Sequence, residues 1–318
     1  MTLAIRCSAA HIRAAEEKLK MTRQKVRTIL GAVLAFACVA NTGFAQTQAT
    51  TTNGTQTSGD RDQSAAAMAQ EAANPFSSRW LMQIQQNNNS IDMPLGNGNR
   101  MQSNLQFQPL LSVALSDKWG LYMRPVVTMV NSLPQLDQNG HSERTNGFGD
   151  TVLGIAAARP LLGGRLVLGA GPTFAFPTAS ERELGQDTWQ IGPDVGATLL
   201  GKNFIAYGFV QQWFKVGGDG RDTNQMNGVF NFTYTLSNGF TIGTQPNLSV
   251  NWEAPADNRV AFSIGPQIGK LCRCGGTPTL FQVQVEYYPV RPNVSGPEWN
   301  IQLQVTPTIP ALIKKTLF

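Results

Sequence analysis

The sequence predicts an all-β protein, a transmembrane antiparallel up-and-down β-barrel of about twelve strands. Three observations predict this fold class. Segments with alternating polar and apolar side chains follow one another from about Trp80 onward. Short and long connections alternate between them, and the few charged residues within them share the polar parity. A soluble sandwich has no reason to sort its connections by length.

The chain begins with an expected export signal, residues 1–45. A basic stretch at 23–27 precedes the apolar run ILGAVLAFACVA, and small residues at 43–45 suit cleavage by signal peptidase. The apolar run is too short to cross a membrane as a helix. Because the residues ahead of Met21 form a separate mixed-charge segment, Met21 is an alternative start.

The formal charge of +5 belongs to this signal, which holds seven of the 25 Lys and Arg residues and two of the 20 Asp and Glu residues. The remaining chain carries 18 basic and 18 acidic residues and is neutral. Nucleic acid is therefore not an expected partner.

Residues 46–76 are rich in Thr, Gln and Ala, and we expect a disordered periplasmic leader there. The barrel is expected over 77–306, followed by a tail over 307–318. The expected strands are 78–87, 101–115, 119–131, 148–158, 166–176, 188–199, 204–214, 226–236, 240–250, 259–268, 279–288 and 298–306.

The connections place the two ends of the barrel. SDK, GKN and SNG are tight turns, and KLCRCGGTP is the longest connection on the same side. Between them lie longer connections such as NSLPQLDQNGHSERTNG and PTASERELGQD. Outer-membrane barrels have short turns on the periplasmic side and long loops outside.

The stretch MQSNLQFQPLLSV at 101–113 shows which face is which. We expect its apolar face to meet lipid (Met101, Leu105, Phe107, Leu111, Val113) and its amide face to line the lumen (Gln102, Asn104, Gln106, Gln108). All six tryptophans fall at or beside a segment end, which indicates aromatic girdles.

Charged side chains within strands are costly against lipid but not in a watery lumen. Those of the predicted strands lie on the polar parity, and their charges sum to zero. With inward amides they give the predicted pore-lining residues: Arg124, Asp150, Gln190, Asp194, Asn247, Arg259, Gln284 and Glu286.

Several stretches resemble one known family, the outer-membrane proteins of the MetA-pathway of phenol degradation, which are often described as transporters. They are GFGDTVLG, GAGPTFAFPTAS, WQIGPDVGATL, QPNLSVNWEA and YYPVRPNVSGPEWNIQLQV, and they cover roughly residues 146–306. The resemblance implies an outer-membrane barrel associated with passage of small organic compounds such as aromatics. The Thr/Gln leader, the LCRC turn and the tail depart from the family pattern.

No catalytic residue, metal or cofactor is expected. His141 beside Ser142 lies in a predicted loop and does not form a supported nucleophile and base pair. Asp219, Asp222 and Asn224 do not have the spacing of a calcium loop. Cys272 and Cys274 are open to three interpretations: incidental thiols, a disulfide or a metal site.

The sequence thus predicts a non-enzymatic outer-membrane channel or transporter for small organic compounds. Its expected partners are outer-membrane lipid, the barrel assembly machinery and a small organic solute. A closed structural or adhesion barrel is the alternative, and an outer-membrane lipid hydrolase is a second one. The solute, the oligomeric state and whether residues 46–74 plug the lumen stay open.

Overall fold

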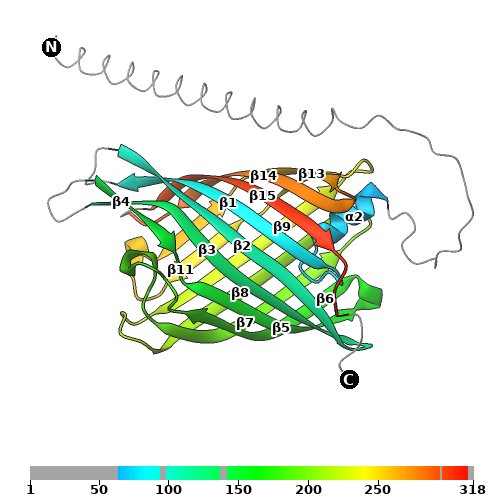
Figure 1. Ribbon diagram of the computed structural model, residues 1–318, viewed down its shortest axis with the longest axis horizontal. Helices are drawn as coiled ribbons and strands as arrows, with labels where there is room; N and C mark the ends of the chain where they lie inside the picture. Colours follow the sequence, from blue (N-terminus) through cyan, green and yellow to red (C-terminus); the bar gives the residue numbers. More distant parts are fainter. Residues whose placement is uncertain (1–63, 94–97, 137–141, 294–295, 314–318) are drawn as a thin grey trace, which may run out of the picture. The chain divides into compact units, whose positions relative to one another are not determined.

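The computed structural model describes residues 64–93, 98–136, 142–293 and 296–313. They form a closed antiparallel barrel of twelve strands, so the predicted fold class is confirmed. The strands cross the barrel at a marked slant (Figure 1), as closure of a sheet requires.

The wall consists of fifteen labelled strands, because three of the twelve are interrupted. Each interrupted pair, β4 with β5, β10 with β11 and β12 with β13, spans the wall as one strand. The bounds are β1 (Trp80–Met93), β2 (Gly98–Ser116), β3 (Trp119–Leu136), β4 (Ser142–Phe148), β5 (Thr151–Leu161), β6 (Leu166–Phe176), β7 (Trp189–Leu200), β8 (Phe204–Gly217), β9 (Asn224–Thr235), β10 (Phe240–Thr244), β11 (Asn247–Asn251), β12 (Val260–Ile264), β13 (Pro266–Cys274), β14 (Thr277–Val290) and β15 (Pro297–Ile309), with single 3-10 turns at Leu162–Gly164, Arg182–Leu184 and Ala256–Asn258.

The barrel closes between its first and last strands. Ile84 of β1 lies opposite Phe107 of β2 on one side and Val305 of β15 on the other. Apart from β4, which pairs with β3 alone, every labelled strand has two neighbours, so the barrel wall leaves little open edge at which sheets aggregate.

Two interruptions lie side by side in the wall. Pro246 separates β10 from β11 and has no N–H to donate to a ladder. Gly265 separates β12 from β13, and a Cβ there would stand 1.8 Å from the Val285 carbonyl oxygen. Only two residue pairs join β12 to β14, so backbone pairing is weak at this place.

The two ends of the barrel differ as the sequence predicts. The short-turn end holds the connections after β2, β5, β7, β9 and β13, together with the start of β1 and the end of β15. The connection after β13 is shorter than expected: it is Gly275 and Gly276 alone, whose positive φ values of 56° and 86° suit a two-residue hairpin turn.

The other end, the long-loop end, contains more strand than the sequence indicated. β1 continues to Met93 and β2 starts at Gly98, and β4 occupies part of the expected loop before β5. At the short-turn end, β15 runs to Ile309, three residues into the predicted tail. Cross-strand pairing outside the alternating core of each segment explains these extensions.

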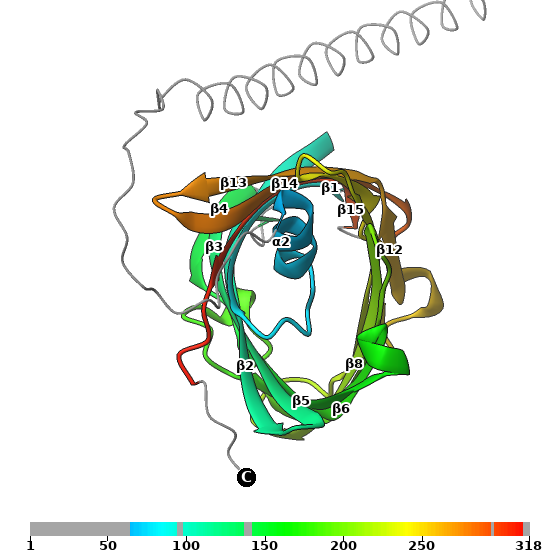
Figure 2. The ribbon, with the colours of Figure 1, turned by 90° about the vertical axis from the view of Figure 1, so that its right-hand side faces the viewer.

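The expectation of disorder in the leader is wrong for its last part. Helix α2 (Ala65–Ala72) forms there, and Figure 2 shows it inside the ring of strands. Ser64 caps it by accepting a hydrogen bond from the Ala67 amide at 3.2 Å. Residues 46–63 lie outside the described residues. Within the described part of the chain, no helix is long and apolar enough to cross a membrane.

Candidate channel lumen

The faces of β2 agree with the sequence prediction over most of the strand. Phe107 is 44% exposed on the outside, whereas its neighbour Gln108 points inward and is 4% exposed. Met101 is exposed like Phe107, but Val113 is buried at 5% exposure, which the sequence did not predict.

The outer surface is apolar on the other strands as well. On β7, for example, Ile191, Val195 and Leu199 are exposed, and the alternate positions Asp194 and Thr198 are buried. Five tryptophans fit the girdle prediction, but Trp213 does not. It shares the inward parity of β8 and is 4% exposed, so it belongs to the lumen.

Amide side chains form a connected chain along the wall of β1, β2, β14 and β15. Gln83 donates to Gln304 Oε1 at 3.0 Å, and Gln304 donates to Gln282 Oε1 at 3.0 Å. Along β1, Gln83 donates to Gln85 at 3.2 Å and Gln85 to Asn87 at 3.0 Å. These neutral groups satisfy one another, so the wall is polar without carrying charge.

The wall across the lumen from β1 is aromatic, and a cation lies beside the amide wall, on β3 next to β2. Tyr207 and Phe209 of β8 face inward, with ring centroids 5.6 Å apart. Arg124 of β3 points into the same space and donates to Gln108 Oε1. Asp194 is near enough to attract Arg124 electrostatically and accepts a hydrogen bond from Gln211 at 2.8 Å.

Glu286 is the most enclosed charge of the wall, at 1% exposure. Its Oε1 accepts hydrogen bonds from Asn247 and Ser263, and its Oε2 accepts one from Asn300, all at 2.7 Å. The donors come from β11, β12 and β15. The carboxylate therefore ties four strands together beside the two interruptions, where the β12–β14 ladder is short.

The other predicted pore-lining residues have different places. Gln284 lies on the inner wall and donates to the Gln245 carbonyl at 2.9 Å. Gln190 donates to Thr188 Oγ1 and to Gln186 Oε1 toward the long-loop end. The structure thus places both on the lumen side, and their role in a pore stays a prediction.

Asp150 and Arg259, predicted to line the pore, instead make their contacts with loops at the long-loop end. Asp150 accepts hydrogen bonds from the Ala179 and Gln186 amides, so it holds the 177–188 loop. Arg259 precedes β12 in a loop, and its guanidinium donates to the Ala254 carbonyl at 3.3 Å. Both charges stabilise loops, because the strands begin one residue after each of them.

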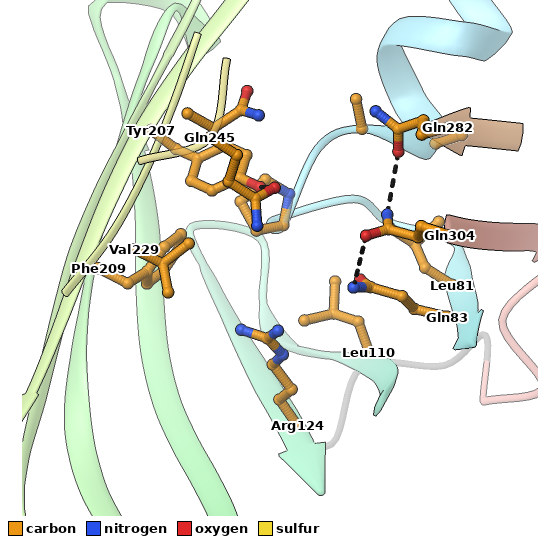
Figure 3. A pocket seen from close by; sticks show the side chains of 14 residues that line it. Leu81, Gln83, Leu110, Arg124, Tyr207, Phe209, Val229, Gln245, Gln282 and Gln304 are labelled. Carbon is orange, nitrogen blue, oxygen red and sulfur yellow. Dashed lines mark hydrogen bonds between the residues drawn. The ribbon is translucent and has the colours of Figure 1, made fainter. Parts of the chain in front are cut away.

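A narrow cavity lies at the level of Arg124 (Figure 3). It is about 50 Å³ in volume, and it is bounded by both walls, by the last residue of α2 (Ala72) and by Ala73 and Pro75 just after the helix. An apolar cavity that accepts benzene is about 150 Å³. A benzene-sized solute would therefore fit this particular cavity only if the side chains around it moved.

Helix α2 is fixed at the short-turn end by two kinds of contact. Ala69 and Ala72 are buried against Leu271 of β13 and Leu280 of β14. On another side, Gln70 donates to the Gly201 and Phe204 carbonyls at 2.7 and 2.8 Å. The helix thus bridges separate parts of the ring inside the barrel at that end.

Phe76 anchors the segment between α2 and β1. Its ring packs against Tyr122 and Phe209, with centroid distances of 5.0 and 5.4 Å. A Cβ at Gly169 would stand 2.7 Å from the Phe76 ring, so glycine there provides room for the ring. Residues 64–76 therefore form a plug, by which we mean α2 together with this anchor.

A wider space opens at the long-loop end. It measures about 690 Å³ and lies between the loops at 185–187, 220–223 and 251–255. Its walls carry Arg182 and Arg221 as well as Asp187, Asp222 and Glu253. It forms a polar vestibule above the narrow lumen.

The cysteines and loop aspartates that the sequence singled out do not form a catalytic or metal site in the described part of the chain. Cys272 and Cys274 are free thiols. Asp222 lies 3.7 Å from Lys215 Nζ. Among the described residues, no group of three or more His, Cys, Asp or Glu side chains is arranged to hold a metal. His141 lies outside the described residues.

Sequence reasoning missed three parts of the lumen. The inward direction of Tyr207 and Phe209 was missed because β8 has apolar side chains on both faces, so the pattern does not show which face is inside. The inward direction of Trp213 was missed for the same reason. The plug was missed because AAAMAQEA has no amphipathic period, although Ser64 before a run of good helix formers is a start signal.

Comparison with known proteins shows similarity of fold to solved structures only. No family model matches the chain, and no curated protein matches it. Among solved structures, it is similar to the COG4313 outer membrane channel from Pseudomonas putida F1, with a TM-score of 0.55, 13% identity, and coverage of 73% of this chain and 95% of the other. Two further similarities are to KdgM porin (TM-score 0.39, 11% identity, 71% and 98% covered) and to the CymD monoaromatic hydrocarbon channel (TM-score 0.38, 10% identity, 77% and 90% covered).

The chain therefore belongs to the class of closed antiparallel β-barrels with an apolar exterior and a polar interior. At 13% identity, the likeness to the Pseudomonas putida channel shows a common fold and nothing narrower. Membership in the phenol-degradation family that the sequence resembles stays a prediction.

Proposed function

We propose that this protein is an outer-membrane channel for small organic compounds, aromatics among them. The observation that supports it best is the distribution of polarity. Large apolar side chains are exposed outside, and uncharged amides and hydroxyls are buried inside. This is the reverse of a soluble protein and suits hydrocarbon around the barrel and water within it.

The short-turn end faces the periplasm in this proposal, because outer-membrane barrels place short turns there. The plug then lies at the periplasmic end and the vestibule opens outside. Surrounding outer-membrane lipid and the barrel assembly machinery are the implied partners. Aromatics as solutes rest on the family resemblance, and the inward Tyr207 and Phe209 offer faces for stacking.

A closed structural barrel is the second candidate. The 50 Å³ cavity, the hydrogen-bonded amides and the plug all favour it. The two candidates differ in whether a solute can pass through the lumen.

Single-channel recording in planar bilayers separates them. We expect protein purified from outer membranes to give discrete conductance steps, and phenol added to one side to reduce the current in a concentration-dependent manner. Protein that inserts into the bilayer but never conducts, even at high voltage, would support the closed barrel. Conductance that phenol leaves unchanged would remove aromatics as the solute class.

A further inference from the structure

Basic side chains gather at the short-turn end. Each of its five turns has a cation in it or beside it: Lys118, Arg165, Lys202, Lys270 and Arg273, with Arg159 near the second turn. All are exposed except Lys270, which is half-buried. Asp117 is the acidic residue in these turns. Arg273 reaches Met68 Sδ of α2 inside the barrel at 3.4 Å, so we define the basic ring as the other five cations: Lys118, Arg159, Arg165, Lys202 and Lys270.

The long-loop end has the opposite balance. In three of its loops, at 177–188, 218–223 and 252–259, seven acidic residues face three basic ones, and the described part of the loop after β14 adds Arg291. The acidic residues are Glu181, Glu183, Asp187, Asp219, Asp222, Glu253 and Asp257, and the basic ones are Arg182, Arg221 and Arg259. The two ends of the barrel therefore differ in charge, with basic residues at the short-turn end and mainly acidic residues in the loops at the other end.

Two members of the basic ring extend from the outer face of the wall. The Arg159 guanidinium carbon stands 6.0 Å from the ring centroid of Trp119, and Lys270 Nζ stands 4.2 Å from that of Phe240. Lys270 also donates to the Asn238 carbonyl at 2.7 Å. Lys270 shares the outward parity of Ile268, which is 52% exposed.

Cations on aromatic rings at the edge of an apolar wall occupy the headgroup level of a bilayer. Long basic side chains reach out of hydrocarbon to that level, where negative lipid groups attract each cation. The spacing of the basic ring around the barrel suits many separate headgroups better than one compact ligand.

We propose that the basic ring binds anionic phospholipid headgroups of the leaflet that surrounds the short-turn end. This rests on the proposed membrane placement and adds a lipid class as a specific partner. The ring selects phosphatidylglycerol-type lipids over zwitterionic ones through charge, and no single deep pocket is needed.

The test measures lipid preference directly. Native protein is reconstituted in vesicles of phosphatidylcholine with phosphatidylglycerol, and one lipid at a time is brominated so that it quenches tryptophan fluorescence. We expect the relative association constant to favour phosphatidylglycerol several-fold at low salt, since each nearby cation contributes on the order of a fivefold preference. The preference should vanish near 1 M NaCl, where the Debye length is about 3 Å.

Matched variants assign the effect to one end. Arg165→Gln with Lys202→Gln should reduce the preference at least about twofold. Arg182→Gln with Arg221→Gln removes the same charge from the long-loop end and should leave it unchanged. These four side chains are exposed, so folding is not at risk.

The outcomes are distinguishable from those of the channel proposal, because the assay needs no conduction. Protein that inserts but shows equal quenching by both lipids overturns the basic ring as a lipid site. Equal losses in both double variants overturn its location. Protein that fails to enter vesicles overturns both proposals.

Discussion

At the scale of single residues, the lumen contains charges in two different settings. The Glu286 carboxylate is enclosed by three donors, whereas Arg124 borders the open cavity. The first arrangement stabilises the wall, and the second is in a position to act on what passes.

Glu286→Ala should destabilise the barrel. The Asn247, Ser263 and Asn300 side chains lose their acceptor, and a buried donor left without one costs about 1 to 3 kcal/mol. Glu286→Gln keeps one acceptor oxygen and should lose less. Urea unfolding in lipid vesicles measures both.

The control is Glu298→Gln. Glu298 lies 3.7 Å from Arg291, and both side chains are partly exposed. Such a pair contributes about 0 to 1 kcal/mol. A Glu286→Ala variant no less stable than Glu298→Gln would show that the four-strand tie contributes nothing.

Arg124 should set a weak anion preference in the conducting state. It is the charged side chain that borders the cavity, whereas Asp194 stands behind it with Gln211. We expect Arg124→Gln to shift the reversal potential in a KCl gradient toward cation preference. Asp194→Asn should shift it the opposite way. Identical reversal potentials for the two variants would place the constriction elsewhere.

At the scale of elements, the strands were predictable and the helix was not. Alternation along β7 marks inward Gln190 and Asp194 against outward Ile191, and turn residues such as Gly201 mark where strands end. These are local signals. Arg259 and Asp150 share the polar parity but lie one residue before their strands. The sequence pattern did not reveal this, because parity does not locate a strand end.

The contacts of α2 depend on residues distant in sequence. Ala69 is buried only because Leu271 and Leu280 close around it. Likewise, Glu286 receives donors from three other strands, which no local pattern could indicate. Because these contacts join residues distant in sequence, the sequence could indicate which residues face the lumen but not which of them contact one another.

Phe76→Ala should loosen the plug. Its ring packs on Tyr122 and Phe209, and truncating a buried phenylalanine costs about 3 to 5 kcal/mol. Since α2 keeps its other contacts, we expect more frequent openings, seen as a higher open probability in planar bilayers.

The matched control is Phe174→Ala on the outer face, where Phe174 stacks on Phe176 at 6.2 Å. This variant should gate as the native protein does. A Phe76→Ala channel with unchanged open probability would mean that residues 64–76 do not limit passage.

At the scale of the whole molecule, the barrel has an inside, an outside and two unlike ends. The apolar outer face, the amide-lined lumen and the basic ring each follow from where the strands place alternate side chains. The proposed placement in a membrane depends above all on the apolar outer face meeting hydrocarbon.

A pair of adjacent arginine substitutions in β2 tests that claim most directly. Phe107 lies at the middle of β2 and is exposed outside, and Gln106 points inward and is half-buried. In urea unfolding from lipid vesicles, Phe107→Arg should lose about 2 to 4 kcal/mol, the cost of a cation near the bilayer midplane. Gln106→Arg should lose much less, because water and amides surround it. Equal losses, or a larger loss for Gln106→Arg, would contradict the assignment of the two faces.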